Sequence, residues 1–237
     1  MKLLAFESSA KAASAALLQD GVLLAEYFQN SGQTHSRTLT KMAEALLRGC
    51  DVPVQALDAV AAAAGPGSFT GVRIGLAAAK GLAWALEKPL VGVSTLEAMA
   101  WSAACSDGIY ECCMDARRNQ IYHARFRVRD GQVGRMTEDR AISMEELSEE
   151  IKKLETSVFL LGDGAQLCYN SLNASLPGLR LAPEHLRQQR ASGVALCAAR
   201  QLAAGAAADA RTLAPNYLRL SQAERERMEK QTVQSGT

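Results

Sequence analysis

A glycine-rich turn, Gly-Pro-Gly-Ser-Phe-Thr-Gly at residues 65–71, joins an apolar run at 58–64 to an alanine-rich segment at 70–86. The run predicts a buried strand and the segment predicts a helix. The first turn of a helix has N–H groups without intrahelical partners and the positive end of the helix dipole, so phosphate is the ligand that this arrangement favours. The turn is not a Walker A loop, which ends in Gly-Lys-Ser/Thr, and its glycine spacing does not fit the Rossmann fingerprint.

The same glycines have a second interpretation. Gly71, Gly75 and Ala79 recur every four residues, so they share one face of the predicted helix. Such a face would let another helix pack closely against it. The sequence leaves both interpretations open, a phosphate cradle or a packing face.

The first predicted strand, at residues 2–6, ends in Glu7-Ser8-Ser9. An acid at a strand end could hold a metal through water. The alternative is a strand terminus at which a serine caps a turn.

Three arginines could contact RNA. Arg125, Arg127 and Arg129 alternate with apolar residues, which places them on one face of a predicted strand at 120–128. They could bind phosphates, or they could form a solvated face that discourages sheet aggregation. The three histidines are scattered along the chain, a pattern that argues against a hydrolytic zinc site.

Two predicted helices could present a surface to a partner protein. The helix at 37–48 and the helix at 70–86 both carry more small or apolar positions than one core face needs. The candidate positions are Leu39, Met42, Ala43, Leu46, Ile74, Ala78 and Leu82. The alternative is that all of them are core residues.

Composition narrows the function classes. The formal net charge of the 237-residue chain is +1, so no bulk field attracts nucleic acid or membrane. No apolar run approaches the roughly 20 residues that span a bilayer. The six cysteines form no Cys-x-x-Cys pair, as expected for reduced cysteines in the cytoplasm.

The predicted elements occur in two similar halves, each with three antiparallel strands followed by alternating helices and strands. Asp20-Gly21 marks the hairpin of the first half and Asp130-Gly131 marks that of the second. The pattern predicts an α/β protein of two ribonuclease-H-like lobes, at residues 1–104 and 105–220, with a polar tail at 221–237. A long helix at about 191–207 is expected near the lobe junction.

Several of these motifs resemble the bacterial TsaB (YeaZ) family. They are Glu7-Ser8-Ser9, residues 64–93, Asp-Ala-Arg-Arg at 115–118 and Pro-Asn-Tyr-Leu-Arg-Leu-Ser-Gln-Ala-Glu-Arg at 215–225. The resemblance implies the fold of the actin, sugar-kinase and heat-shock-chaperone superfamily. It also implies a role in making threonylcarbamoyladenosine beside the tRNA anticodon, as the noncatalytic partner of the catalytic paralogue TsaD. The ATPase TsaE would join the assembly, ATP and metal would be held by partner subunits, and tRNA would be contacted indirectly.

A comparison with the paralogue bears on catalysis. The stretch at 93–99 is similar to Val-Asn-His-x-Glu-Gly-His of TsaD, whose two histidines hold a metal. Thr95 and Met99 stand in their places, and hydroxyl and thioether groups are poor replacements as metal ligands. This difference implies a pseudoenzyme without its own cofactor.

The resemblance also assigns roles to individual residues. The two helices of the first lobe would pair with those of TsaD, or with a second copy of the chain. Gly71 and Gly75 would lie in that contact and Arg73 would lie at its rim. A vestigial phosphate loop would comprise Glu7, Ser8, Ser9, Gly65, Gly67 and Ser68. A stand-alone ATPase or kinase and a glycoprotease-like metallopeptidase are the alternative functions.

Overall fold

The first lobe is built on a five-stranded sheet in the computed structural model, which describes residues 1–154, 156–206 and 210–219. Its strands are β1 (Lys2–Glu7), β2 (Ala13–Gln19), β3 (Val22–Gln29), β4 (Ala59–Gly65) and β5 (Leu90–Ser94), in the order β3-β2-β1-β4-β5. The β1–β2 and β2–β3 pairs are antiparallel, whereas β1, β4 and β5 run parallel. Asp20 and Gly21 both have positive φ, as a tight hairpin turn requires.

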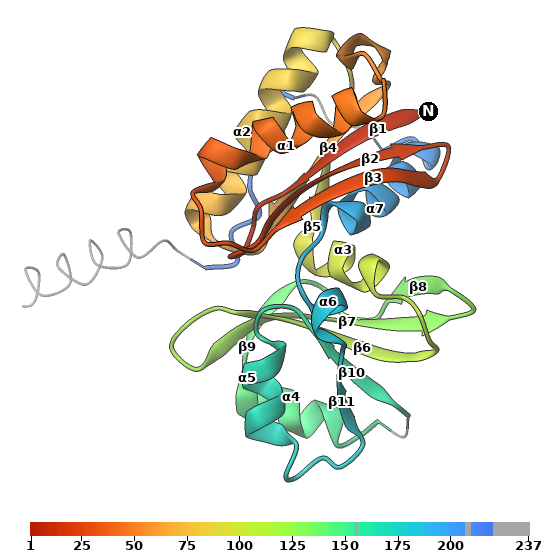
Figure 1. Ribbon diagram of the computed structural model, residues 1–237. Helices are drawn as coiled ribbons and strands as arrows, with labels where there is room; N and C mark the ends of the chain where they lie inside the picture. The colour runs from red at the N-terminus through yellow and green to blue at the C-terminus, as the bar shows by residue number, and fades with distance from the viewer. Residues whose placement is uncertain (155, 207–209, 220–237) are drawn as a thin grey trace, which may run out of the picture.

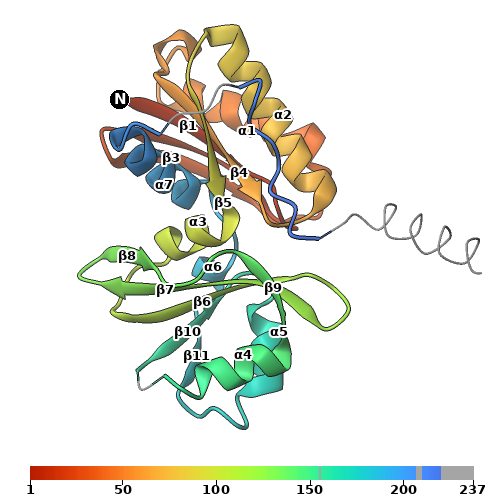
Figure 2. The ribbon, with the colours of Figure 1, turned by 180° about the vertical axis from the view of Figure 1, so that it is seen from behind.

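Helices cover both faces of this sheet (Figures 1 and 2). Helices α1 (His35–Gly49) and α2 (Phe69–Leu86) pack on one face, and α7 (Ala191–Ala203) packs on the other. A short 3₁₀ turn, Val54–Ala56, precedes β4. Alanines fill much of the core between these layers, so the elements approach closely.

The second lobe repeats this sheet topology. Its elements are β6 (Gly108–Asp115), β7 (Gln120–Arg129), β8 (Gln132–Arg135), β9 (Arg140–Ser143), α4 (Met144–Ile151), β10 (Val158–Leu161), α5 (Ala165–Leu172), β11 (Leu179–Leu181) and α6 (Glu184–Arg187). The strand order is β11-β10-β6-β7-β8, with β9 also paired to β7. Strand β6 thus takes the place of β1, and the predicted pair of ribonuclease-H-like lobes is confirmed.

Helix α3 (Thr95–Ser102) lies between the two sheets (Figure 1). Ala98 packs into the core beneath the first sheet, whereas Leu96 and Met99 pack against the second sheet. The lobes therefore share one apolar junction.

The C-terminal part of the chain returns to the first lobe. Helix α7 follows the second lobe in sequence, yet it packs against β1, β2, β4 and α3. The predicted range 105–220 for the second lobe thus includes a helix that packs on the first lobe. The contact between α7 and α3 puts this helix at the lobe junction, which is the position expected for it. Residues 210–219 also lie on the first lobe, and the predicted tail at 221–237 lies outside the described residues.

Two further observations bear on the sequence-based expectations. None of the helices in the described ranges has the length and apolar character needed to cross a membrane. All six cysteines are free, and four of them are buried. Burial raises the pKa of the Cys112 and Cys197 thiols, which keeps them in the unreactive protonated form.

Two helical glycines predict opposite effects of the same substitution. A Cβ on Gly193 of α7 would lie 2.0 Å from the Ala98 carbonyl oxygen of α3, whereas a Cβ on Gly81 of α2 would meet nothing within 4 Å. We expect Gly193→Ala to lower the free energy of unfolding by about 1–3 kcal/mol. Gly81→Ala should raise it by about 0.5–1 kcal/mol, because alanine favours the helix. Urea denaturation of both variants measures this, and a stabilised Gly193→Ala protein would contradict the packing described for α3 and α7.

Candidate functional site

The glycine-rich turn lies against the loop that follows β1. A Cβ on Gly67 would lie 2.5 Å from the Ser9 carbonyl oxygen, and a Cβ on Gly71 would lie 2.1 Å from the Ser8 carbonyl oxygen. A Cβ on Gly75 would lie 2.5 Å from Ser8 Oγ. The glycines therefore permit one loop to approach another. The expectation that Gly71 and Gly75 open a face to another helix is wrong, because both are buried against this loop.

The polar groups of this contact bind one another. The Ser68 N–H donates to the Ser9 carbonyl over 2.6 Å, and the Gly71 N–H donates to Ser68 Oγ over 3.2 Å. The Ser9 N–H donates to Glu7 Oε1, and Ser8 Oγ donates to the Gly71 carbonyl. Three N–H donors of this contact, those of Ser9, Ser68 and Gly71, are thus already engaged within the chain.

Glu7 is buried at the end of β1, with 1% of its surface exposed. Burial raises the pKa of its carboxyl from 4.5 to about 7, an effect that hydrogen bonds from Ser9 oppose and the nearby Asp163 carboxyl reinforces. Its Oε2 and the hydroxyl of buried Ser9 have no hydrogen-bond partner among the described residues. Glu7 therefore carries only part of its negative charge near neutral pH.

A polar hollow of about 570 Å³ opens between the lobes beside this contact. Ser9, Gly67 and Ser68 line it from the first lobe, and Asp115, Arg117 and Asp163 line it from the second. The hollow brings together the ends of β1, β4 and β6, as the two-lobe prediction expected. Arg219, from the C-terminal segment, closes part of its wall.

Thr95 and Met99, the positions that the resemblance pairs with metal-binding histidines of the paralogue, lie inside the lobe junction. Thr95 is fully buried, and its hydroxyl has no partner among the described residues. Met99 is 2% exposed and packs in the core between α3 and the second sheet. In the described ranges, no group of three or more His, Cys, Asp or Glu side chains is arranged to hold a metal ion.

The predicted arginine stripe is interrupted. Arg125 is buried, and it forms ion pairs with Glu111 at 2.6 Å and with Glu150 of α4 at 3.2 Å. Its predicted contact with RNA is therefore wrong, because α4 and the neighbouring strand enclose it. Arg127 and Arg129 are exposed near the opposite end of β7 from the hollow.

The two predicted interface helices differ in what they expose. Leu39, Met42, Ala43 and Leu46 of α1 are all buried in the core of the first lobe. Their predicted role in a partner surface is wrong for this fold, since their apolar stripe packs against β2 and α2. On α2, Ile74, Ala78 and Leu82 are half-buried.

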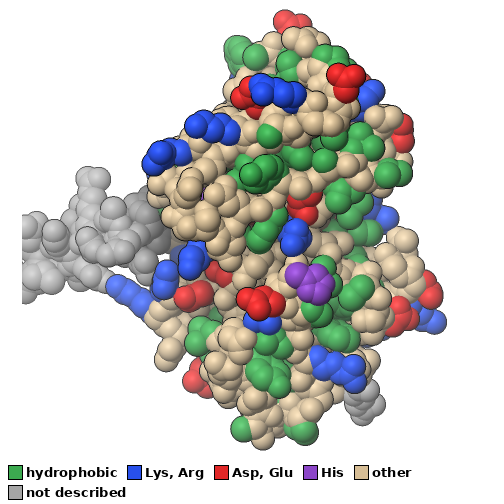
Figure 3. Space-filling view, in the orientation of Figure 1, with side chains coloured by type: hydrophobic (Ala, Val, Ile, Leu, Met, Phe, Trp, Pro, Cys, Tyr) green, Lys and Arg blue, Asp and Glu red, His purple; other side chains and the backbone are tan. Residues whose placement is uncertain are grey.

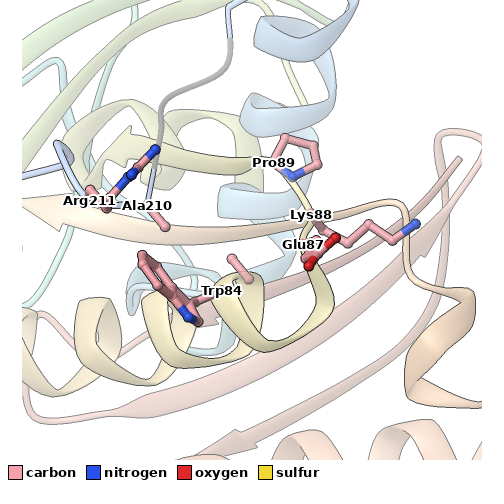
Figure 4. Close-up of a pocket in the computed structure, with 7 residues that line it drawn as sticks. Trp84, Glu87, Lys88, Pro89, Ala210 and Arg211 are labelled. Carbon is pink, nitrogen blue, oxygen red and sulfur yellow. The ribbon is translucent and has the colours of Figure 1, made fainter.

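The exposed face of α2 comprises residues that the sequence analysis did not single out. They are Ala77, Gly81, Trp84 and Ala85, in addition to Arg73. Trp84 is 64% exposed and lines a hollow of about 460 Å³ with Glu87, Pro89 and Arg211 (Figure 4). Helical spacing alone could have revealed this second stripe of small residues on α2.

Residues 210–219 form a strap across the first lobe. The Asn216 N–H donates to the Ala64 carbonyl at the end of β4. Tyr217 stacks on Phe69 with ring centroids 4.0 Å apart, and it receives a hydrogen bond from Arg73 Nε over 2.7 Å. Arg219 then donates to the Ala116 carbonyl of the second lobe over 2.6 Å. Arg73, predicted at the rim of a partner contact, thus holds the strap in this structure.

The burial of Glu7 predicts a pH-dependent stability. The folded state holds the Glu7 proton more tightly than the unfolded state, so stability is lost as pH rises from 4.5 through about 7. Glu7→Gln removes this loss, and we expect its advantage over the wild type to grow by up to about 3 kcal/mol between pH 5 and pH 8. Urea denaturation at both pH values measures it, with the exposed Glu138→Gln variant as the control for removing one charge. An equal effect of Glu7→Gln at both pH values would contradict a raised pKa.

Comparisons with known proteins agree on one family. The family model TsaD, "tRNA N6-adenosine threonylcarbamoyltransferase", matches residues 23–227. The "tRNA threonylcarbamoyladenosine biosynthesis protein TsaB" of Bacillus subtilis is 32% identical over 235 residues, which cover 98% of this chain and 100% of the relative. The Escherichia coli TsaB protein is 32% identical over 70% of this chain and 73% of its own length.

Solved structures give the same result. The structure "YeaZ from Pseudomonas aeruginosa" matches with a TM-score of 0.76 and 26% identity, over 92% of this chain and 99% of that one. A dehydratase component from Acidaminococcus fermentans, at 12% identity and a TM-score of 0.51, shares the two-lobe fold alone. The glycine-rich turn, the two lobes and these full-length similarities place the chain in the TsaB (YeaZ) family.

Proposed function

We propose that this chain is a noncatalytic subunit of the assembly that transfers a threonylcarbamoyl group to the adenosine beside the tRNA anticodon. Its catalytic partner would be the paralogue TsaD, with TsaE as the associated ATPase and with ATP and metal held on those subunits. The assembly would work in the cytoplasm. The observation that carries the proposal is the closed contact between the glycine-rich turn and the Ser8-Ser9 loop, in which three N–H donors are already engaged.

The lobe junction supports the same proposal. The side chains of Thr95 and Met99 are buried there between the two lobes. Glu7, at the end of β1, is also buried, and burial raises the pKa of its carboxyl to about 7. An ATPase of this superfamily would need free N–H groups at the glycine-rich turn to bind phosphate, and an ionised acid at the position of Glu7. These features support a subunit that keeps the superfamily fold without performing the chemistry itself.

The surface that best fits a partner is the exposed face of α2. Ala77, Gly81 and Ala85 are small, so a partner helix could lie close to the α2 backbone. Trp84 stands beside them with 64% of its surface exposed, and tryptophan is enriched among residues that dominate binding energies. The same face could support a homodimer in the absence of TsaD.

A charge placed on this face should weaken partner binding. We expect Ala77→Glu to raise the Kd for TsaD at least about tenfold, because the carboxylate would be buried without a partner. Ala174→Glu, at an exposed position in the second lobe, is the matched control and should leave the Kd unchanged. Isothermal titration calorimetry measures both. Unaltered binding by Ala77→Glu would show that α2 is not the interface.

The isolated chain should not turn over nucleotide. We expect its ATP hydrolysis with Mg²⁺ to equal the buffer background, because the N–H groups of Ser9, Ser68 and Gly71 are engaged within the chain and cannot stabilise a transferred phosphoryl group. A coupled phosphate-release assay on the wild type and on Glu7→Ala measures this. Robust turnover that Glu7→Ala abolishes would instead establish the stand-alone ATPase.

A further inference from the structure

Basic side chains gather at the mouth of the interlobe hollow. Three of them line the hollow: Lys11 after β1, Arg117 in the β6–β7 turn and Arg219 in the strap. The fourth, Arg118, is the exposed neighbour of Arg117 in the same turn. Figure 3 shows Lys and Arg side chains along the left edge of the molecule, where the two lobes meet. We call these four residues the mouth surface.

The structure presents these charges outward. Arg117, Arg118 and Asn119 have positive φ values of 65°, 54° and 58°, and this tight turn leaves all three exposed. Arg219 donates hydrogen bonds to the backbone carbonyls of Ala116 and Arg117, and these neutral acceptors do not cancel its charge.

Two acids lie nearby. Asp115 accepts a hydrogen bond from the Arg117 N–H, and its carboxylate lies 3.5 Å from the Arg117 guanidinium. Asp163 is largely buried, and burial raises the pKa of its carboxyl. Even with the buried Glu7 beside Asp163 counted as a third acid, the four cations leave a local positive excess in a chain whose net charge is only +1.

Aromatic rings border the same mouth. Phe69 and Tyr122 line the hollow, and Tyr217 stacks on Phe69 with 39% of its surface exposed. The Arg73 guanidinium lies 4.2 Å from the centroid of the Phe69 ring. Cations that follow a phosphate backbone, beside aromatic faces on which bases stack, are the features that bind single-stranded nucleic acid.

We infer that the mouth surface binds the phosphate backbone of a single-stranded RNA loop, with Tyr217 as a stacking face beside it. This inference rests on the proposed function, in which the substrate is the loop of a tRNA anticodon arm. It moves the RNA contact away from the strand face that carries Arg125, which the structure buries, to the end of the β6–β7 hairpin nearest the hollow.

A matched pair of double variants tests the assignment. Arg117→Gln/Arg118→Gln removes two charges from the mouth, and Arg127→Gln/Arg129→Gln removes two exposed charges near the other end of β7. The probe is a fluorescent anticodon-arm RNA hairpin. Anisotropy titrations at several salt concentrations are made with the full chain, alone and in complex with TsaD.

We expect the mouth variant to weaken binding about tenfold and to lower the salt slope by about 1–2, one phosphate contact per charge removed. The control variant should change neither quantity. Tyr217→Leu should weaken binding of the hairpin more than binding of a blunt RNA duplex, which offers no unstacked bases.

The opposite results overturn the inference. They are equal losses in the two double variants, a loss confined to Arg127→Gln/Arg129→Gln, or no binding of the hairpin by the wild-type chain or its complex. Calorimetric binding of TsaD by the same variants, measured without RNA, separates a failure of this inference from a failure of the proposed function.

Discussion

The structure depends on one backbone contact, that of the glycine-rich turn with the loop after β1. Gly67 and Gly71 lie so close to the carbonyls of Ser9 and Ser8 that any Cβ would overlap them. This proximity fixes the start of α2 over the end of β1 and engages the N–H groups of Ser68 and Gly71 in hydrogen bonds within the chain. The glycine-rich turn, whose composition suggests phosphate binding, thus serves to pack the start of α2 against the loop after β1.

Helix α3 and the strap connect the first lobe to the second. Helix α3 packs Ala98 toward one sheet and Met99 toward the other, so apolar contacts hold the lobes together at their centre. The strap adds a polar link at the periphery, where Tyr217 binds the first lobe and Arg219 binds the second. An acid with a raised pKa, Glu7, lies buried at the end of β1. The surfaces that we propose for contact with other molecules, the exposed face of α2 and the mouth surface, both lie outside this packed centre.

The sequence predicted the two sheets well because Asp-Gly hairpins and apolar runs are local signals. It did not predict which stripe of an amphipathic helix faces inward, so Leu39 and Met42 of α1 were assigned to a surface although they are core residues. The predicted RNA contact of Arg125 was wrong for a similar reason. Its ion-pair partner Glu150 lies 25 positions later in the sequence, and the two side chains meet only in the folded lobe. The sequence analysis expected α7 near the lobe junction, but local spacing does not reveal that α7 and the strap pack on the first lobe.

The central claim is that the chain contributes a surface to the assembly and contributes no catalytic group. The most direct measurement is the rate of threonylcarbamoyladenosine formation on tRNA by TsaD and TsaE with wild-type, Glu7→Gln or Ala77→Glu chain. The account predicts the wild-type rate with Glu7→Gln and a large loss with Ala77→Glu. A Glu7→Gln chain that binds TsaD normally but abolishes product formation would contradict it.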